Sequence, residues 1–176
     1  GKKLISNYGY YINKKNRVNK LSKSTALQST MIIHDYSSCD FFKNEKKYLD
    51  NGLNLLKNII KTSIDNQGFP KSRNIRQLIF YLKYFIIIRE WFKESQNVVP
   101  EYIDENIYYL GQGYCFAWQN VNQDILFNGN YISNNDEFDQ YLKRFGYKFI
   151  NKNKEHSGYT ILRNKKISLV MDVGSS

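Results

Sequence analysis

Apolar residues in the middle of the chain recur at the spacing of one helix face. From Glu45 to about Asp65 the apolar positions repeat every three or four residues, at Leu49, Leu53, Leu56, Ile60 and Ile64. This period predicts a helix with one buried side. Gly68 and Pro70, in the stretch DNQGFPKSRN, then form a turn signal that ends this helix before another begins.

Two further helices are predicted after this turn. The segment from about Ile75 to Glu94 carries a stripe of apolar residues on one side of the predicted helix. Within this segment, Ile87 and Ile88 make the apolar stripe wider, so we expect a helix packed on two faces. The next helix enters through Pro100, with acidic residues in its first turn, where the positive end of the helix dipole favours them. The sequence does not decide whether the later half of this segment is helical, because two glycines, at positions 111 and 113, interrupt the helical pattern.

The remaining segments predict a short helix between stretches of β structure. Residues 134–146 read as a helix capped by Asn134 or Asn135 and stopped by Gly146. Residues 2–8 and 29–35 predict strands, and GYTILRNKKISLVMDVG predicts a β-hairpin around an Asn-Lys-Lys turn. Helices in the middle with β segments at both ends predict an α+β fold in two layers.

Composition and charge narrow the class of protein. A chain of 176 residues with 41% hydrophobic content has enough apolar surface to bury a core, which excludes a disordered tail. The formal charge is +10, and residues 1–23 carry seven basic side chains and no acidic one. An excess of positive charge favours binding of a polyanion, which could be nucleic acid, anionic lipid or an acidic polysaccharide. The alternative is that the basic residues form a solvated face and bind no partner.

Several classes of site find no support in the sequence. Cys39 and Cys115 show no metal-ligand spacing and no disulfide framework, although a single bridge between them stays open. No metal ligand set and no cofactor motif is recognised. Charged residues interrupt the most apolar segment, 75–92, which argues against a membrane span. The N-terminus has no secretory pattern and no initiator Met, which suggests an internal fragment and leaves the compartment open.

Three windows taken together resemble a known family. GFPKSRNIRQLIFYLKYFIIIREW, then DILFNG, then HSGYTILRNKKISLVMDVG are similar to the bacterial heparinase II/III-like proteins, at the seam between an α-helical toroid and a β-sandwich. This resemblance covers residues 45–176. The opening window, including KLSKSTALQSTMIIHDYSSC, resembles a sandwich stretch that normally lies downstream of the MDVG hairpin. The order therefore departs from that of the family, as in a circular permutant, a junction of tandem copies or a misassembled gene fragment.

The resemblance implies both an architecture and an activity. It implies a β-sandwich segment over 1–43, part of an α/α toroid with three to four helices over 44–152, and an antiparallel sandwich hairpin over 153–176. It also implies a polysaccharide lyase that cleaves acidic, uronate-containing glycans by β-elimination, without a cofactor, in the periplasm or outside the cell. The chemistry needs a group that neutralises the uronate carboxylate, a base for the C5 proton and an acid for the leaving oxygen.

The turn before the second helix supplies the first candidate site residues. By resemblance, Arg73 and Asn74 contact the substrate, and an Arg there would grip a carboxylate or sulfate. The alternative is that Ser72 or Asn74 only caps the helix while Arg73 is solvated. The best-known heparinases have a Tyr-His pair after a comparable turn, but this chain has Ile-Arg-Gln at 75–77, so that Tyr does not carry over.

Four further residues complete the predicted site. His156 and Tyr159 are the candidate proton carriers, and the alternative is a loop histidine beside a strand tyrosine. Asn128 is a turn residue that joins the substrate site only if its turn faces the cleft. Gln28 stands where the family commonly shows the His of a TAxHST pattern; glutamine bonds a sugar but does not titrate near neutral pH.

Two functions other than a lyase stay open. One is a non-catalytic module that binds acidic glycans. The other is a general polyanion binder, including nucleic acid, although no recognised nucleic-acid motif supports it. We expect an acidic polysaccharide as partner, no membrane partner, and nucleic acid only as the weaker alternative.

Overall fold

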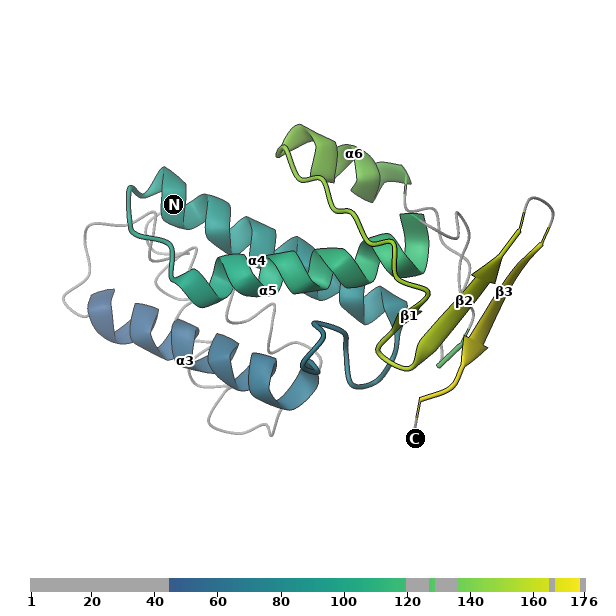
Figure 1. Cartoon of the computed structure of the whole chain (residues 1–176). Helices are drawn as coiled ribbons and strands as arrows, with labels where there is room; N and C mark the ends of the chain where they lie inside the picture. Colours follow the sequence, from purple (N-terminus) through teal and green to yellow (C-terminus); the bar gives the residue numbers. More distant parts are fainter. Residues whose placement is uncertain (1–44, 120–126, 129–135, 165–166, 175–176) are drawn as a thin grey trace. The chain divides into compact units, whose positions relative to one another are not determined.

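The computed structural model describes residues 45–119, 127–128, 136–164 and 167–174 of the chain. Over these residues the elements are α3 (Glu45–Ser63), α4 (Ile75–Glu94), α5 (Glu101–Tyr114), the π-helical turn η1 (Cys115–Gln119), α6 (Asp136–Arg144), β1 (Glu155–His156), β2 (Tyr159–Arg163) and β3 (Ser168–Asp172) (Figure 1). Helices followed by a three-stranded antiparallel sheet confirm the predicted α+β class. The strands predicted at 2–8 and 29–35 lie outside the described residues.

The chain divides into two compact units. One unit comprises residues 1–62 and 83–104, and the other comprises 63–82 and 105–176. One boundary lies before the last residue of α3, and the other two fall within α4 and α5, so α4 and α5 each contribute to both units. The division into segments 1–43, 44–152 and 153–176 stays a prediction.

The first helix keeps the predicted apolar period but buries a slightly different set of residues. Leu56 and Ile59 of α3 are buried, although Ile59 was not part of the predicted stripe. The helix ends at Ser63, slightly earlier than predicted. Ile64 is instead in a β-bridge with Pro70, which closes the turn that leads into α4.

Specific caps define both ends of α4, which has the predicted bounds. At the N-terminus, the side-chain oxygen of Asn74 accepts hydrogen bonds from the backbone N–H groups of Arg76 (2.9 Å) and Gln77 (3.3 Å). This confirms that Asn74 caps the helix. At the C-terminus, Gln96 has a φ of 56° and the following N–H bonds to the carbonyl oxygen of Phe92, as in a Schellman motif.

Buried apolar side chains occur along the whole length of α4. Those that are at most 5% exposed are Ile75, Leu78, Leu82, Phe85, Ile86, Ile88 and Phe92. Because Ile86 and Ile88 point to different sides of a helix, the prediction of packing on two faces is confirmed. Within the described ranges, no helix is both long enough and apolar enough to cross a membrane.

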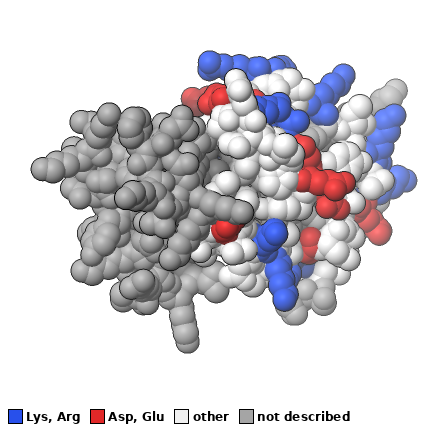
Figure 2. All heavy atoms as spheres, turned by 90° about the vertical axis from the view of Figure 1, so that its left-hand side faces the viewer, with Lys and Arg blue, Asp and Glu red and all other residues white. Residues whose placement is uncertain are grey.

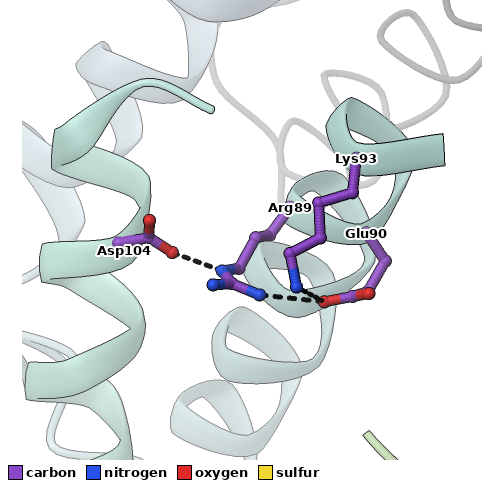
Figure 3. Close-up of polar contacts among 4 residues, drawn as sticks. All are labelled: Arg89, Glu90, Lys93 and Asp104. Carbon is purple, nitrogen blue, oxygen red and sulfur yellow. Dashed lines mark hydrogen bonds and ion pairs between the residues drawn. The ribbon is translucent and has the colours of Figure 1, made fainter. Parts of the chain in front are cut away.

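Charged side chains join α4 to α5 within the first unit. Arg89 of α4 forms an ion pair with Asp104 of α5 and a second one with Glu90 (3.1 Å), which also pairs with Lys93 at 3.2 Å (Figure 3). Asp104 is half exposed, at 50% of its side chain. Partly exposed pairs of this kind contribute about 1 kcal/mol or less each to stability.

Close packing explains the two glycines of α5. A Cβ at Gly111 would lie 2.0 Å from the ring of Phe149, and one at Gly113 would lie 3.0 Å from the ring of Phe69 and 3.3 Å from Nε2 of His156. The helix runs through both positions and continues into η1. The glycines therefore permit side chains to approach the helix rather than ending it.

The short helix α6 ends where the sequence predicted. Gly146 has a φ of 75°, its N–H bonds to the carbonyl oxygen of Lys143, and the next N–H bonds to that of Leu142. This is the glycine-terminated Schellman arrangement. The predicted caps, Asn134 and Asn135, lie outside the described residues.

Asp139 fixes α6 to the end of α5 and to η1. Its carboxylate accepts hydrogen bonds from the Tyr114 hydroxyl (3.0 Å) and from the indole N–H of Trp118 (3.3 Å). Burial and the charge of Asp139 raise the pKa of Tyr114. The Tyr114 hydroxyl therefore stays protonated and donates its hydrogen bond to Asp139, which is a structural role.

The sheet has the order β1-β2-β3, with both pairs antiparallel. The β2–β3 pair confirms the predicted hairpin, and its register places Tyr159 opposite Asp172. Strand β1 was not predicted. It joins β2 through Ser157 (φ 46°) and Gly158 (φ 77°), the pair of positive φ values that a type I′ turn requires.

Candidate functional site

Polar side chains from three distant parts of the chain meet beside the N-terminus of α4, within the second unit. The Tyr159 hydroxyl donates to the carbonyl oxygen of Arg73 (2.7 Å) and accepts from Nδ2 of Asn128 (2.7 Å). Nδ2 of Asn74 donates to the carbonyl oxygen of Asn128 (2.9 Å). We refer to Arg73, Asn74, Asn128, Tyr159 and Asp172 as the Arg73 cluster.

Arg73 is paired rather than solvated. Its guanidinium forms an ion pair with Asp172 and donates from Nη2 to the carbonyl oxygen of Gly158 (2.7 Å). It lies over the ring of Tyr159, 4.8 Å from the ring centroid, and its side chain is only 15% exposed. A Cβ at Gly174 would lie 2.2 Å from Nη1, so only glycine leaves room for the guanidinium there.

The two asparagines form the more accessible side of the cluster. Asn128 is exposed and has a φ of 54°, a conformation that asparagine tolerates better than most residues. Its Nδ2 also donates to Asp172, at 3.1 Å. Asn74 is half-buried and uses one side-chain N–H toward Asn128; its second N–H has no partner among the described residues.

Tyr159 is fully buried, at 0% exposure, with its ring 5.7 Å from that of Phe69. Burial raises the pKa of the hydroxyl, and the charge of Asp172 adds to this effect. The hydrogen bond from Asn128 and the charge of Arg73 oppose it in part. The hydroxyl is therefore protonated at neutral pH, which suits a proton donor and not a base.

His156 lies one strand away, directly opposite Tyr159 in the β1–β2 register. It is 8% exposed, and its ring contacts those of Phe69 (5.9 Å) and Phe116 (5.4 Å). Its Nε2 has no hydrogen-bond partner among the described residues. Burial lowers the pKa of His156, partly opposed by the charge of Asp65. The imidazole is therefore neutral at neutral pH and able to accept a proton.

The pKa of His156 predicts a loss of stability in acid. Because its pKa in the folded protein lies below the ordinary value of 6.5, the unfolded chain binds the proton first as the pH falls. The free energy of unfolding should therefore decrease below about pH 6.5, by at most about 1.4 kcal/mol per pH unit from this residue. Urea unfolding of the wild type and of His156→Leu at pH 7.5 and pH 5 isolates the effect, because the carboxylates titrate in both proteins. An equal loss in both would contradict the prediction.

The ion pair of Arg73 predicts a further, site-specific effect on stability. Arg73→Met removes the guanidinium and leaves Asp172, which is 27% exposed, with the amide of Asn128 as its remaining partner. We expect the free energy of unfolding to decrease by about 2 kcal/mol. The control is Arg89→Met, whose partner Asp104 is 50% exposed, and we expect a decrease of about 1 kcal/mol or less. Chemical denaturation measures both, and a larger loss at Arg89 would argue against a structural role of Arg73.

The structure brings together most of the residues that the sequence singled out. Arg73, Asn74, Asn128 and Tyr159 bond to one another, and His156 lies on the adjacent strand. Gln28 lies outside the described residues. The roles assigned to these residues stay predictions.

Two contacts were not predicted from the sequence. Asp172 was noted only as part of the MDVG stretch, and its pairing with Arg73 has no local signal because 98 residues lie between them in the chain. Gln67 was not noted at all, yet its side-chain oxygen accepts the backbone N–H of Ser157 at 2.6 Å. This bond holds the β1–β2 turn against the loop that precedes α4.

The groups of the Arg73 cluster define what it can do chemically. Among the described residues, no group of three or more His, Cys, Asp and Glu side chains converges to hold a metal ion. The cluster offers amide donors, a protonated hydroxyl and a paired guanidinium. Such groups can bind an oxyanion or a sugar hydroxyl and transfer one proton.

The comparisons with known proteins identify the opening part of the chain. Residues 1–68 match the family model described as heparinase II/III-like, C-terminal. No curated protein and no solved structure matches the chain significantly. The match includes the KSTALQST stretch and ends in the loop before α4. The match confirms the resemblance to the heparinase II/III-like family over residues 1–68, which is less than half of the chain.

Proposed function

We propose that this protein is a polysaccharide lyase of the heparinase II/III-like type, which cleaves acidic, uronate-containing glycans by β-elimination. The observation that carries the proposal is the convergence of Arg73, Asn74, Asn128 and Tyr159. These residues lie in three separate windows that resemble the family, and they form one hydrogen-bonded cluster. The match of residues 1–68 to the family supports the same reading.

Each demand of β-elimination has a candidate group in or beside the cluster. The side-chain N–H of Asn74 that is not bonded to Asn128, next to the guanidinium of Arg73, would bind the uronate carboxylate. Neutral His156 would accept the C5 proton, and the protonated hydroxyl of Tyr159 would give a proton to the leaving oxygen. The C5–H and C4–O bonds break, and a C4–C5 double bond forms. His156 gains the C5 proton and Tyr159 gives one proton to the leaving oxygen, so the number of protons is conserved.

The charge distribution suggests which part of the chain attracts the polymer. Seven of the basic side chains lie in residues 1–23, which carry no acid. On the face shown in Figure 2, by contrast, Lys and Arg side chains of the described residues lie beside Asp and Glu. We propose that residues 1–23 supply most of the attraction to a polyanion, which raises its local concentration.

The architecture that we propose follows the family. Helices α3, α4 and α5 would form part of an α/α toroid, and the β2–β3 hairpin would form part of a β-sandwich. Substrate would then approach the turn before α4, where Asn74 has an unused N–H.

One assay tests the activity directly. The protein is incubated with heparan-type and alginate-type polymers, and the ultraviolet absorbance of the unsaturated uronate product is followed. We expect the absorbance to rise with at least one of them and to stay flat with dextran, which has no uronate. Binding without any rise in absorbance would reject the lyase and leave the second candidate.

The second candidate is a module that binds acidic glycans without cleaving them. Two observations favour it: Asp172 neutralises Arg73, and aromatic rings surround the imidazole of His156. A binding module would show affinity for the uronate polymers and no product absorbance. Equal affinity for DNA, falling steeply with salt, would instead indicate simple attraction of polyanions.

A further inference from the structure

Phe127 is a large aromatic side chain that remains 39% exposed directly beside the Arg73 cluster. Its ring is nearly parallel to that of Tyr159, with an interplanar angle of 4° and a centroid distance of 6.2 Å. Phe127 therefore lies beside the fully buried ring of Tyr159 while part of its own side chain remains open to solvent.

The backbone that carries Phe127 is firmly attached. Its neighbour Asn128 bonds through Nδ2 to Tyr159 and Asp172 and through its carbonyl oxygen to Asn74. These bonds hold the chain in a left-handed turn, with a φ of 54° at Asn128. A ring positioned in this way loses little conformational freedom when a ligand binds, which improves affinity.

We propose that Phe127 is a stacking platform for a pyranose ring of the acidic polysaccharide, with the unused N–H of Asn74 as a donor to an oxygen of the same sugar. This inference rests on the proposed function and adds a residue to it. The C–H groups on one face of a pyranose carry partial positive charge, and the face of an aromatic ring is negative. Sites that bind small molecules combine such an apolar surface with a few placed donors.

Three variants of the full chain test this role. Phe127→Leu keeps an apolar side chain but removes the π face, whereas Phe127→Trp keeps an aromatic face. Phe145→Leu is the matched control, because Phe145 is also 39% exposed and lies at the end of α6. Calorimetric titration with alginate and heparan-type hexasaccharides should show Kd raised about fivefold to tenfold for Phe127→Leu. Phe127→Trp and Phe145→Leu should stay within about twofold of the wild type.

The outcomes separate this inference from the proposed function. If the wild type binds a hexasaccharide and Phe127→Leu binds it equally well, the platform is wrong and the proposed function stands. If both leucine variants weaken binding equally, the effect is general and the platform is also rejected. If the wild type neither binds nor cleaves any uronate polymer, the proposed function fails and the platform fails with it. Thermal unfolding of each variant verifies that the fold is intact.

Discussion

Gly68→Ala is expected to lower the free energy of unfolding by about 3 to 4 kcal/mol. Gly68 has a φ of 78°, and a Cβ there would lie 2.3 Å from Cβ and 2.6 Å from the backbone carbon of Tyr109. The left-handed conformation costs an alanine about 1 kcal/mol. The collision costs more, because a helix backbone cannot move aside as the end of a side chain can.

The control for this prediction is Gly146→Ala. Gly146 has a similar φ of 75°, but a Cβ there would meet nothing within 4 Å. We therefore expect only the conformational cost, about 1 kcal/mol. Urea denaturation of both variants measures the difference. An equal decrease in the free energy of unfolding for both variants would show that Gly68 does not lie close enough to Tyr109 of α5 for a Cβ to collide with it.

Tyr159→Phe is expected to reduce the lyase rate by about a thousandfold, the range in which removal of a positioned proton donor falls. The hydroxyl is protonated at neutral pH, since burial raises its pKa further above the ordinary value of 10.0, and phenylalanine has no proton to give. Stability should decrease by only about 1 kcal/mol, from the lost bonds to Arg73 and Asn128. The rate of formation of the unsaturated product, compared with the free energy of unfolding, separates catalysis from structure.

Tyr108→Phe is the matched control for Tyr159→Phe. Tyr108 is 57% exposed on α5, and its ring contacts only that of Tyr109 in the described part of the chain. Loss of its hydroxyl should change neither the rate nor the stability. If Tyr159→Phe retained the wild-type kcat while losing stability, Tyr159 would be a structural residue and the proton donor would have to be sought elsewhere.

The helices were largely predictable because their signals are local. The bounds of α4 were predicted correctly, since a sustained apolar period runs between Asn74 and the left-handed residue Gln96. The later half of α5 was left open because glycine lowers helix propensity, and only the positions of Phe149 and Phe69 explain why glycine is needed there. Strand β1 has two residues, too few to show an alternating pattern.

The candidate site was predictable as a set of residues but not as a set of bonds. The resemblance selected Arg73, Asn74, Asn128 and Tyr159, and the structure shows them in contact. It gave no sign that Arg73 is neutralised by Asp172, because an ion pair between residues this far apart depends on the fold. The burial of His156 against two phenylalanines had no local signal either, since its neighbours Glu155 and Ser157 are polar.

The hydrogen bonds of the Arg73 cluster also bear on how the site would tolerate evolutionary change. Three of its acceptors are backbone carbonyl oxygens, at positions 73, 128 and 158. Every amino acid carries such an oxygen, so substitution at an accepting position does not by itself remove the bond. The donors are side chains of particular types: a guanidinium, a carboxamide and a phenol. Distant relatives with this site should therefore be recognisable by an Arg-Asn pair before a helix and a tyrosine at the start of a hairpin, even where the accepting positions have diverged.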